Sequence, residues 1–133
     1  MKREIKFKAK CLDNGKWVKG SLIRNTAGIK ERAYIVDNFR SMSDYSVIGV
    51  DPSTICQFTG MKDNEGNEIW EGDTLEGVSN CEVIFEKGTF AARSFDDIFN
   101  KGIMELVTPL HYLKREDGMI ECKVIGNKFD KEK

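Results

Sequence analysis

The sequence predicts a mainly β protein made of short antiparallel strands with little helix. Apolar and polar residues alternate over several short stretches, as expected where successive side chains of a strand point to opposite faces. Turn signals containing Gly, Asn or Asp recur between these stretches. No stretch of the 133 residues sustains an apolar period of 3.6. We therefore expect roughly eight to ten strands in a small barrel or a pair of packed sheets.

The first predicted strand, residues 5–11, has one apolar face and one basic face. Asn14 and Gly15 then predict a tight hairpin turn, because both residues tolerate positive φ. The return strand is residues 16–24, which include Trp17. The basic face of the first strand carries Lys6, Lys8 and Lys10.

Shorter elements fill the middle of the chain. Asp51 and Pro52 end a strand, since proline supplies no ladder donor. Extended structure then resumes until Gly60. The predicted strands here are residues 33–36, 45–50 and 54–59, separated by polar loops at 25–32 and 37–44.

The second half of the chain shows turn residues at 63–66, a corner at Gly72, and a hairpin turn at Lys87 and Gly88. We expect residues 96–106 to form a loop with one helical turn that uses Ile98, Phe99 and Met104. The predicted strands are 68–70, 74 onward, 81–85, 89–95 and 119–125. Two regions result: a hairpin and sheet region at 1–60 and a five-stranded barrel region at 61–133, which together suit one compact domain.

Composition narrows the classes of function. The formal net charge is −1, whereas proteins that hold nucleic acid through its phosphates usually have a basic excess. No apolar run reaches the ~20 residues that a membrane helix needs, and the first residues lack a signal-peptide core. We expect a cytoplasmic protein that contacts no membrane.

The cysteines and the single histidine do not predict a metal site or a catalytic centre. The four cysteines have no C-x-x-C pair, so we expect reduced core thiols and no zinc, although an even count leaves disulfides open. His111 with a cysteine would allow a nucleophilic dyad, but no third orienting group has a recognisable spacing. We expect no catalytic residue, metal or cofactor. The cysteines are Cys11, Cys56, Cys81 and Cys122.

An acidic block in the middle of the chain has two interpretations. Its spacing does not match an EF-hand loop, but two or three of its carboxylates would suit magnesium. We favour a structural turn motif, in which glycines supply positive φ and Asp73 bonds its own backbone. The motif is Gly60, Gly66, Gly72 and Asp73, and the block is Asp63, Glu65, Glu68, Glu71, Asp73 and Glu76.

The aromatic and basic residues also have alternative roles. Trp17 and Trp70 could stack on bases, but tryptophans in short strands more often pack in a core or an interface. The lysines of the first strand could follow a phosphate backbone, or they could protect the edge of a sheet. We favour packing and edge protection, and retain Lys6, Lys8, Lys10, Trp17 and Trp70 as weak binding candidates.

Four segments stand out along the chain: REIKFKAK, NGKWVKGSL, VDPSTICQFTGMKDNEGNEIWEGDTLE and VIGN. Together they resemble the YopX family of bacteriophage and prophage proteins, and the resemblance extends over nearly the whole chain. The resemblance implies a mainly β fold with an SH3-like barrel element, a phage or prophage origin, and a cytoplasmic setting. It implies no established activity, so no catalytic residues are carried over. The segment 25–44 and the tail after Asn127 depart from the usual family pattern.

Three hypotheses for the function follow. The first is a non-enzymatic binding or assembly module that contacts a protein partner or a second copy of itself. The second is a nucleic-acid-binding accessory protein that uses the lysine stripe. The third is a metal-dependent enzyme that uses the acidic block. We favour the first.

Overall fold

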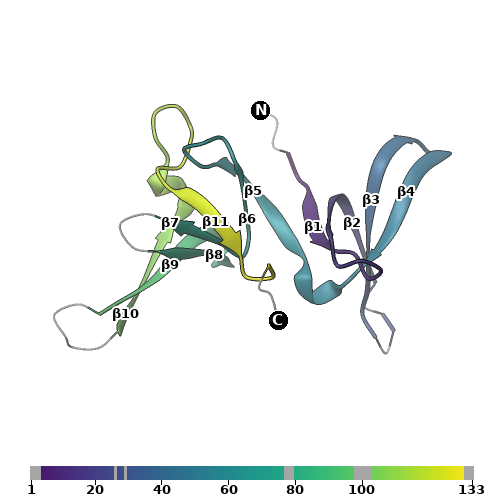
Figure 1. The fold of residues 1–133 in the computed structure, drawn as a ribbon, viewed down its shortest axis with the longest axis horizontal. Coiled ribbons are helices and arrows are strands. Elements are labelled where there is room, and N and C mark those ends of the chain that lie inside the picture. Colours follow the sequence, from purple (N-terminus) through teal and green to yellow (C-terminus); the bar gives the residue numbers. More distant parts are fainter. Residues whose placement is uncertain (1–3, 26, 29, 77–79, 98–102, 131–133) are drawn as a thin grey trace. The chain divides into compact units, whose positions relative to one another are not determined.

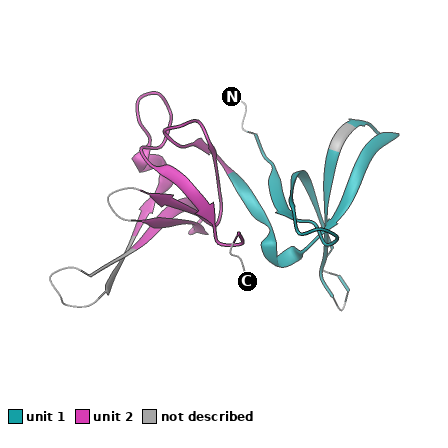
Figure 2. Ribbon diagram, in the orientation of Figure 1, with its two compact units in different colours: residues 1–58 teal, residues 59–133 magenta. Residues whose placement is uncertain are grey.

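The computed structural model describes residues 4–25, 27–28, 30–76, 80–97 and 103–130 and shows a mainly β protein (Figure 1). The chain divides into two compact units, residues 1–58 and 59–133 (Figure 2). Sequence analysis places the division two residues later. No helix among the described residues has the length and apolarity required to span a bilayer.

Unit 1 is built around a six-stranded sheet with the order β4-β3-β2-β1-β5-β6, of which β6 (Glu68–Trp70) belongs to unit 2. Its strands are β1 (Phe7–Lys10), β2 (Trp17–Asn25), β3 (Arg32–Ser41), β4 (Asp44–Val50) and β5 (Cys56–Lys62), which continues into unit 2. A 3-10 turn, η1 (Pro52–Thr54), separates β4 from β5, and the Asp51 side chain caps it.

Strand pairing gives the sheet of unit 1 one buried and one outer face. Leu22, Ile35 and Ile48 lie opposite one another on β2, β3 and β4, and Ile35 is fully buried. One residue along each strand, Ile23, Tyr34 and Gly49 form the matching row on the outer face. The core behind the buried face is Ala9, Ala33, Ile35 and Val50.

Gly20 permits a close approach of β2 and β3 that sequence analysis did not identify. A Cβ at this position would lie 2.2 Å from the Val36 carbonyl oxygen. Real Cβ atoms do not come this close to a backbone oxygen, so only glycine fits without a shift of the backbone.

Unit 2 is built around a second antiparallel sheet with the order β10-β9-β8-β7-β11. Its elements are β6 (Glu68–Trp70), β7 (Asp73–Glu76), β8 (Cys81–Glu86), β9 (Thr89–Asp97), β10 (Ile103–Pro109), the 3-10 turn η2 (Leu110–Leu113) and β11 (Lys123–Asn127). Its core is Ile69, Leu75, Val83, Ala92, Leu110 and Ile120. Among the described residues no pairing joins the end strands β10 and β11, so the SH3-like barrel stays a prediction.

Two predicted loops are wrong. In the segment 37–44, β3 continues to Ser41 and β4 begins at Asp44. Only Met42 and Ser43, between them, form a tight turn. Residues 96–97 end β9, and Met104 lies in β10 instead of a helical turn. Ile98 and Phe99, the other residues expected in that turn, lie outside the described residues. The last predicted strand begins later than expected, at Lys123.

Candidate functional site

Asp63 of the acidic block is fully buried and is surrounded by hydrogen-bond donors. Its Oδ1 accepts from the backbone N–H groups of Glu65 (2.9 Å) and Asn67 (2.8 Å). Its Oδ2 accepts from the backbone N–H of Val124 (2.9 Å) and from the Asn67 side-chain amide (3.1 Å). Burial would raise the pKa of Asp63, but these donors together hold it below the ordinary value.

Asp73 is the second buried carboxylate of the block, at 2 % exposure. Its Oδ2 accepts from the backbone N–H of Trp70 at 2.7 Å, and its Oδ1 accepts from the Asn127 amide at 2.9 Å. The same amide donates to the Glu71 carbonyl at 3.2 Å. Asp73 and Asn127 also face each other across the β7–β11 pairing.

The glycines of the turn motif all have positive φ, but they occupy different places. Gly66 (+84°) lies in the turn after Asp63, and Gly72 (+88°) at the corner before β7. Gly60 (+84°) lies inside β5. A Cβ at Gly72 would meet the Asn127 side chain at 3.2 Å.

The acidic block therefore has structural partners for its two buried carboxylates. The oxygens of Asp63 and Asp73 accept hydrogen bonds from backbone and side-chain donors of the chain itself. These donors balance the two negative charges in the way that a bound cation would. No group of three or more His, Cys, Asp or Glu side chains among the described residues could hold a metal ion.

Lys8 and Lys10 of β1, and Lys6 just before it, lie against aromatic rings. Lys8 Nζ is 4.4 Å from the ring centroid of Trp17, and Lys10 Nζ is 5.1 Å from the same ring. Lys6 Nζ is 4.8 Å from the ring centroid of Phe58. Such contacts occupy the ring face that a base would stack on.

The position of β1 in its sheet tests the expectation that its lysines protect a sheet edge. The strand lies between β2 and β5, so the interpretation of its lysines as protection for a free sheet edge is wrong. Lys8 is 9 % exposed, which shows that its aliphatic stem packs in the sheet.

The other sequence candidates do not form a site. Trp70 is 3 % exposed and therefore offers no stacking surface. The His111 ring contacts its neighbour Tyr112, with centroids 4.5 Å apart. None of the four cysteines forms a disulfide. Burial, with Cys81 and Glu121 nearby, raises the pKa of the Cys122 thiol, which disfavours a nucleophilic thiolate.

One open surface for a partner is the hairpin of β3 and β4, whose residues 37–44 were predicted as a loop between two strands. β4 is the end strand of its sheet. On its outer side, Leu12 N–H donates to the Gly49 carbonyl and Val50 forms a β-bridge with Cys11, so this edge is open only over the first residues of the strand. Residues 44–47 are all exposed. Exposed apolar side chains on the hairpin are Met42 (83 %), Val47 (48 %) and Tyr45 (46 %).

Fold and surface together define a two-unit antiparallel β protein with a buried acidic turn motif and an exposed edge hairpin. A family model described as YopX protein matches residues 6–132. The chain belongs to the YopX family, as its segments already indicated. No curated protein matches the chain.

Proposed function

We propose that this protein is a non-enzymatic assembly module that associates through the free edge of β4. The observation that supports this proposal is that β4 is an end strand and exposes Tyr45 and Val47. Natural edge strands usually bear lysine, proline or a bulge that prevents pairing. The segment DYSVIGV of β4 has no lysine or proline, and its only charge is Asp44 at the start. The one irregularity of the β3–β4 pairing, between Asp37 and Ser41, places the extra residues on β3.

The distribution of charge favours a second copy of the chain as the partner. An antiparallel pair of β4 strands places the two Asp44 carboxylates at opposite ends of the new ladder. A parallel pair would place them side by side, where like charges destabilise a sheet. Antiparallel pairing also brings the exposed Val47 side chains of the two copies towards the middle of the interface.

The cellular setting is part of the same proposal. Membership of the YopX family supports a phage or prophage accessory protein that acts in the bacterial cytoplasm. The alternative of binding to nucleic acid through the β1 lysines has less support, since those lysines lie over Trp17 and Phe58. The alternative of a metal-dependent enzyme gains no support from the acidic block.

Light scattering after size exclusion, run over a range of protein concentrations, tests the proposal. We expect a dimer that Val47→Lys dissociates, because two lysines would face each other in the ladder. Ile125→Lys is the matched control, since Ile125 has the same 48 % exposure and lies on β11, an end strand of the other sheet. A monomer at roughly 1 mM, or equal effects of the two substitutions, would refute pairing through β4.

A further inference from the structure

Two adjoining hollows lie beside β3 in unit 1 and share two cationic side chains. The first has a volume of ≈ 320 Å³, and its apolar lining includes Leu12, Tyr34 and Pro52. The second, of ≈ 330 Å³, is lined by Asn25, Gly28, Lys30 and Arg32. Lys30 and Arg32 line both hollows, so an apolar space and a polar space meet at these cations.

Strand register explains why the apolar hollow exists. Tyr34 lies opposite Gly49 on the outer face of the sheet, so β4 supplies no side chain next to its ring at this position. A Cβ at Gly49 would make only an ordinary contact, 3.6 Å from Leu12 Cδ1. Arg32 is two residues from Tyr34 on the same face of β3, and Asn25 lies opposite Arg32.

The polar hollow is suited to an anion. No acidic residue among the described residues lines it. Glu31, which lines the apolar hollow, forms an ion pair and hydrogen bond with Arg24. Lys30 and Arg32 have no acidic partner among the described residues, so their charge remains available. The Asn25 side-chain oxygen accepts from Ala27 N–H, which leaves its amide N–H groups to face a ligand.

We propose that this double hollow binds one nucleotide unit. The base lies in the apolar hollow against the Tyr34 ring, where stacking tolerates any base. The phosphate lies at Lys30 and Arg32, since a guanidinium fork matches phosphate oxygens. A free nucleotide and the phosphorylated end of a single strand share this chemistry. The site differs from the free edge of β4, so it adds to the assembly proposed above.

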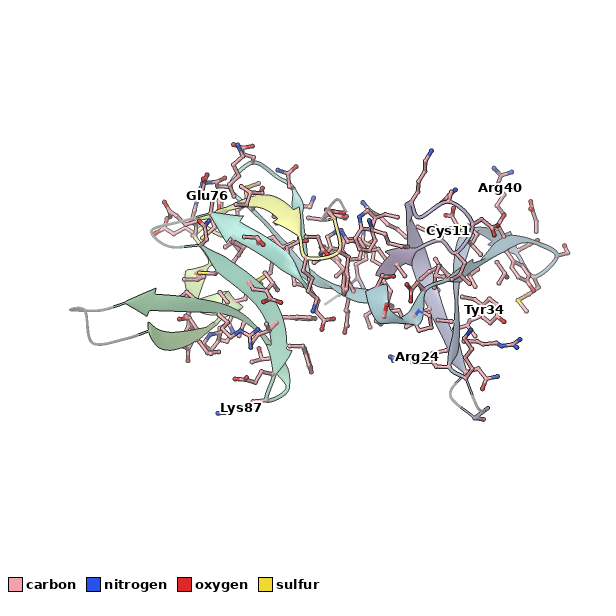
Figure 3. The ribbon with its side chains drawn as sticks, turned by 60° about the horizontal axis from the view of Figure 1, so that its bottom comes forward. Cys11, Arg24, Tyr34, Arg40, Glu76 and Lys87 are labelled. Atoms are coloured by element: carbon pink, nitrogen blue, oxygen red, sulfur yellow. The ribbon has the colours of Figure 1, made fainter. Side chains whose placement is uncertain are left out.

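Calorimetric titration of the full chain with AMP, adenosine and inorganic phosphate tests the site. We expect AMP to bind more tightly than either part alone, because only AMP fills both hollows. Arg32→Gln should weaken the binding of AMP at least about tenfold and leave the binding of adenosine nearly unchanged. The matched control is Arg40→Gln, an exposed arginine farther along the same strand (labelled with Tyr34 in Figure 3).

A second variant tests the apolar hollow separately. Gly49→Leu places a side chain beside Tyr34, with its Cβ in ordinary contact with Leu12, and should abolish binding of both AMP and adenosine. An unchanged circular dichroism spectrum and melting temperature identify a folded variant. Arg32→Lys keeps the charge and should restore part of the affinity lost in Arg32→Gln.

The source of the nucleotide follows from one more titration. Binding of AMP alone supports a free nucleotide, whereas equal binding of a 5′-phosphorylated oligonucleotide supports a strand end. Three results would overturn the proposal: no binding of AMP at roughly 1 mM, equal losses in Arg32→Gln and Arg40→Gln, or unchanged AMP binding in folded Gly49→Leu.

Discussion

Replacing Asp63 by Asn should destabilise unit 2 strongly, although the two side chains have almost the same shape. Each Asp63 oxygen accepts two hydrogen bonds in a site with no solvent exposure. An asparagine keeps one acceptor oxygen and turns an N–H₂ group towards two donors. Hydrogen bonds to charged groups contribute about 1.5–3 kcal/mol each, so the loss of two costs about 3–6 kcal/mol. That is a large share of the ~5–15 kcal/mol that stabilises a typical domain.

Chemical denaturation followed by tryptophan fluorescence measures this loss. A Trp17→Phe background leaves Trp70 as the reporter of unit 2, because each unit holds one tryptophan. The control is Asp117→Asn, which makes the same chemical change in an exposed turn where Asp117 accepts from Met119 N–H and Arg115. We expect a small shift there, since water replaces the lost partners. Equal shifts in the two variants would refute the reasoning.

The pH dependence supplies an independent check. Because the folded-state pKa of Asp63 is below its ordinary value, the ionised carboxylate stabilises the fold above the unfolded-state pKa of about 3.9. This contribution disappears as the pH falls through the folded-state pKa. The stability difference between wild type and Asp63→Asn should stay constant down to about pH 5 and shrink below about pH 4. A difference that grows in acid would contradict the proposed charge state.

Three further substitutions test other contacts, each by chemical denaturation. Gly72→Val should cost about 1–3 kcal/mol, because φ is +88° and the new Cβ meets Asn127 at 3.2 Å; an unchanged midpoint would exclude this strain. Asn127→Leu should cost about 1–3 kcal/mol by removing the amide donor to Asp73, and a neutral result would mean that water or another donor replaces it. Gly20→Ala should cost about 2–3 kcal/mol in unit 1, since its methyl would lie 2.2 Å from the Val36 carbonyl oxygen; a loss seen only in unit 2 would contradict this assignment.

The strands that the sequence reveals are those with one buried face. The hairpin of β8 and β9 is an example, because its alternation is clear and its turn residues Lys87 and Gly88 both adopt positive φ. The β3–β4 hairpin shows the opposite case. Residues 45–50 were predicted as a strand, but β3 also continues through residues 37–41, where the sequence DNFRS is mostly polar and shows no alternation. Such a strand resembles a polar loop until its pairing is known.

The candidate sites were predictable only where their contacts are local. The turn at Asp63 follows from Asp, Asn and Gly close together, but its donor from Val124 lies 61 residues away. The double hollow depends on Tyr34 facing Gly49, which is a matter of register between two strands. The environment of the β1 lysines likewise depends on β1 being an inner strand. None of these long-range pairings leaves a mark in the local sequence.

The bonds from β11 to Asp63 and Asp73 bear on how a cell makes this protein. Residues 1–58 leave the ribosome with every strand partner that unit 1 needs, whereas unit 2 must wait for Val124 and Asn127. A truncated product that stops before Lys123 retains both acids but lacks these two donors. Quality-control proteases would therefore meet an unfinished second half on an otherwise finished first half whenever synthesis stops before β11.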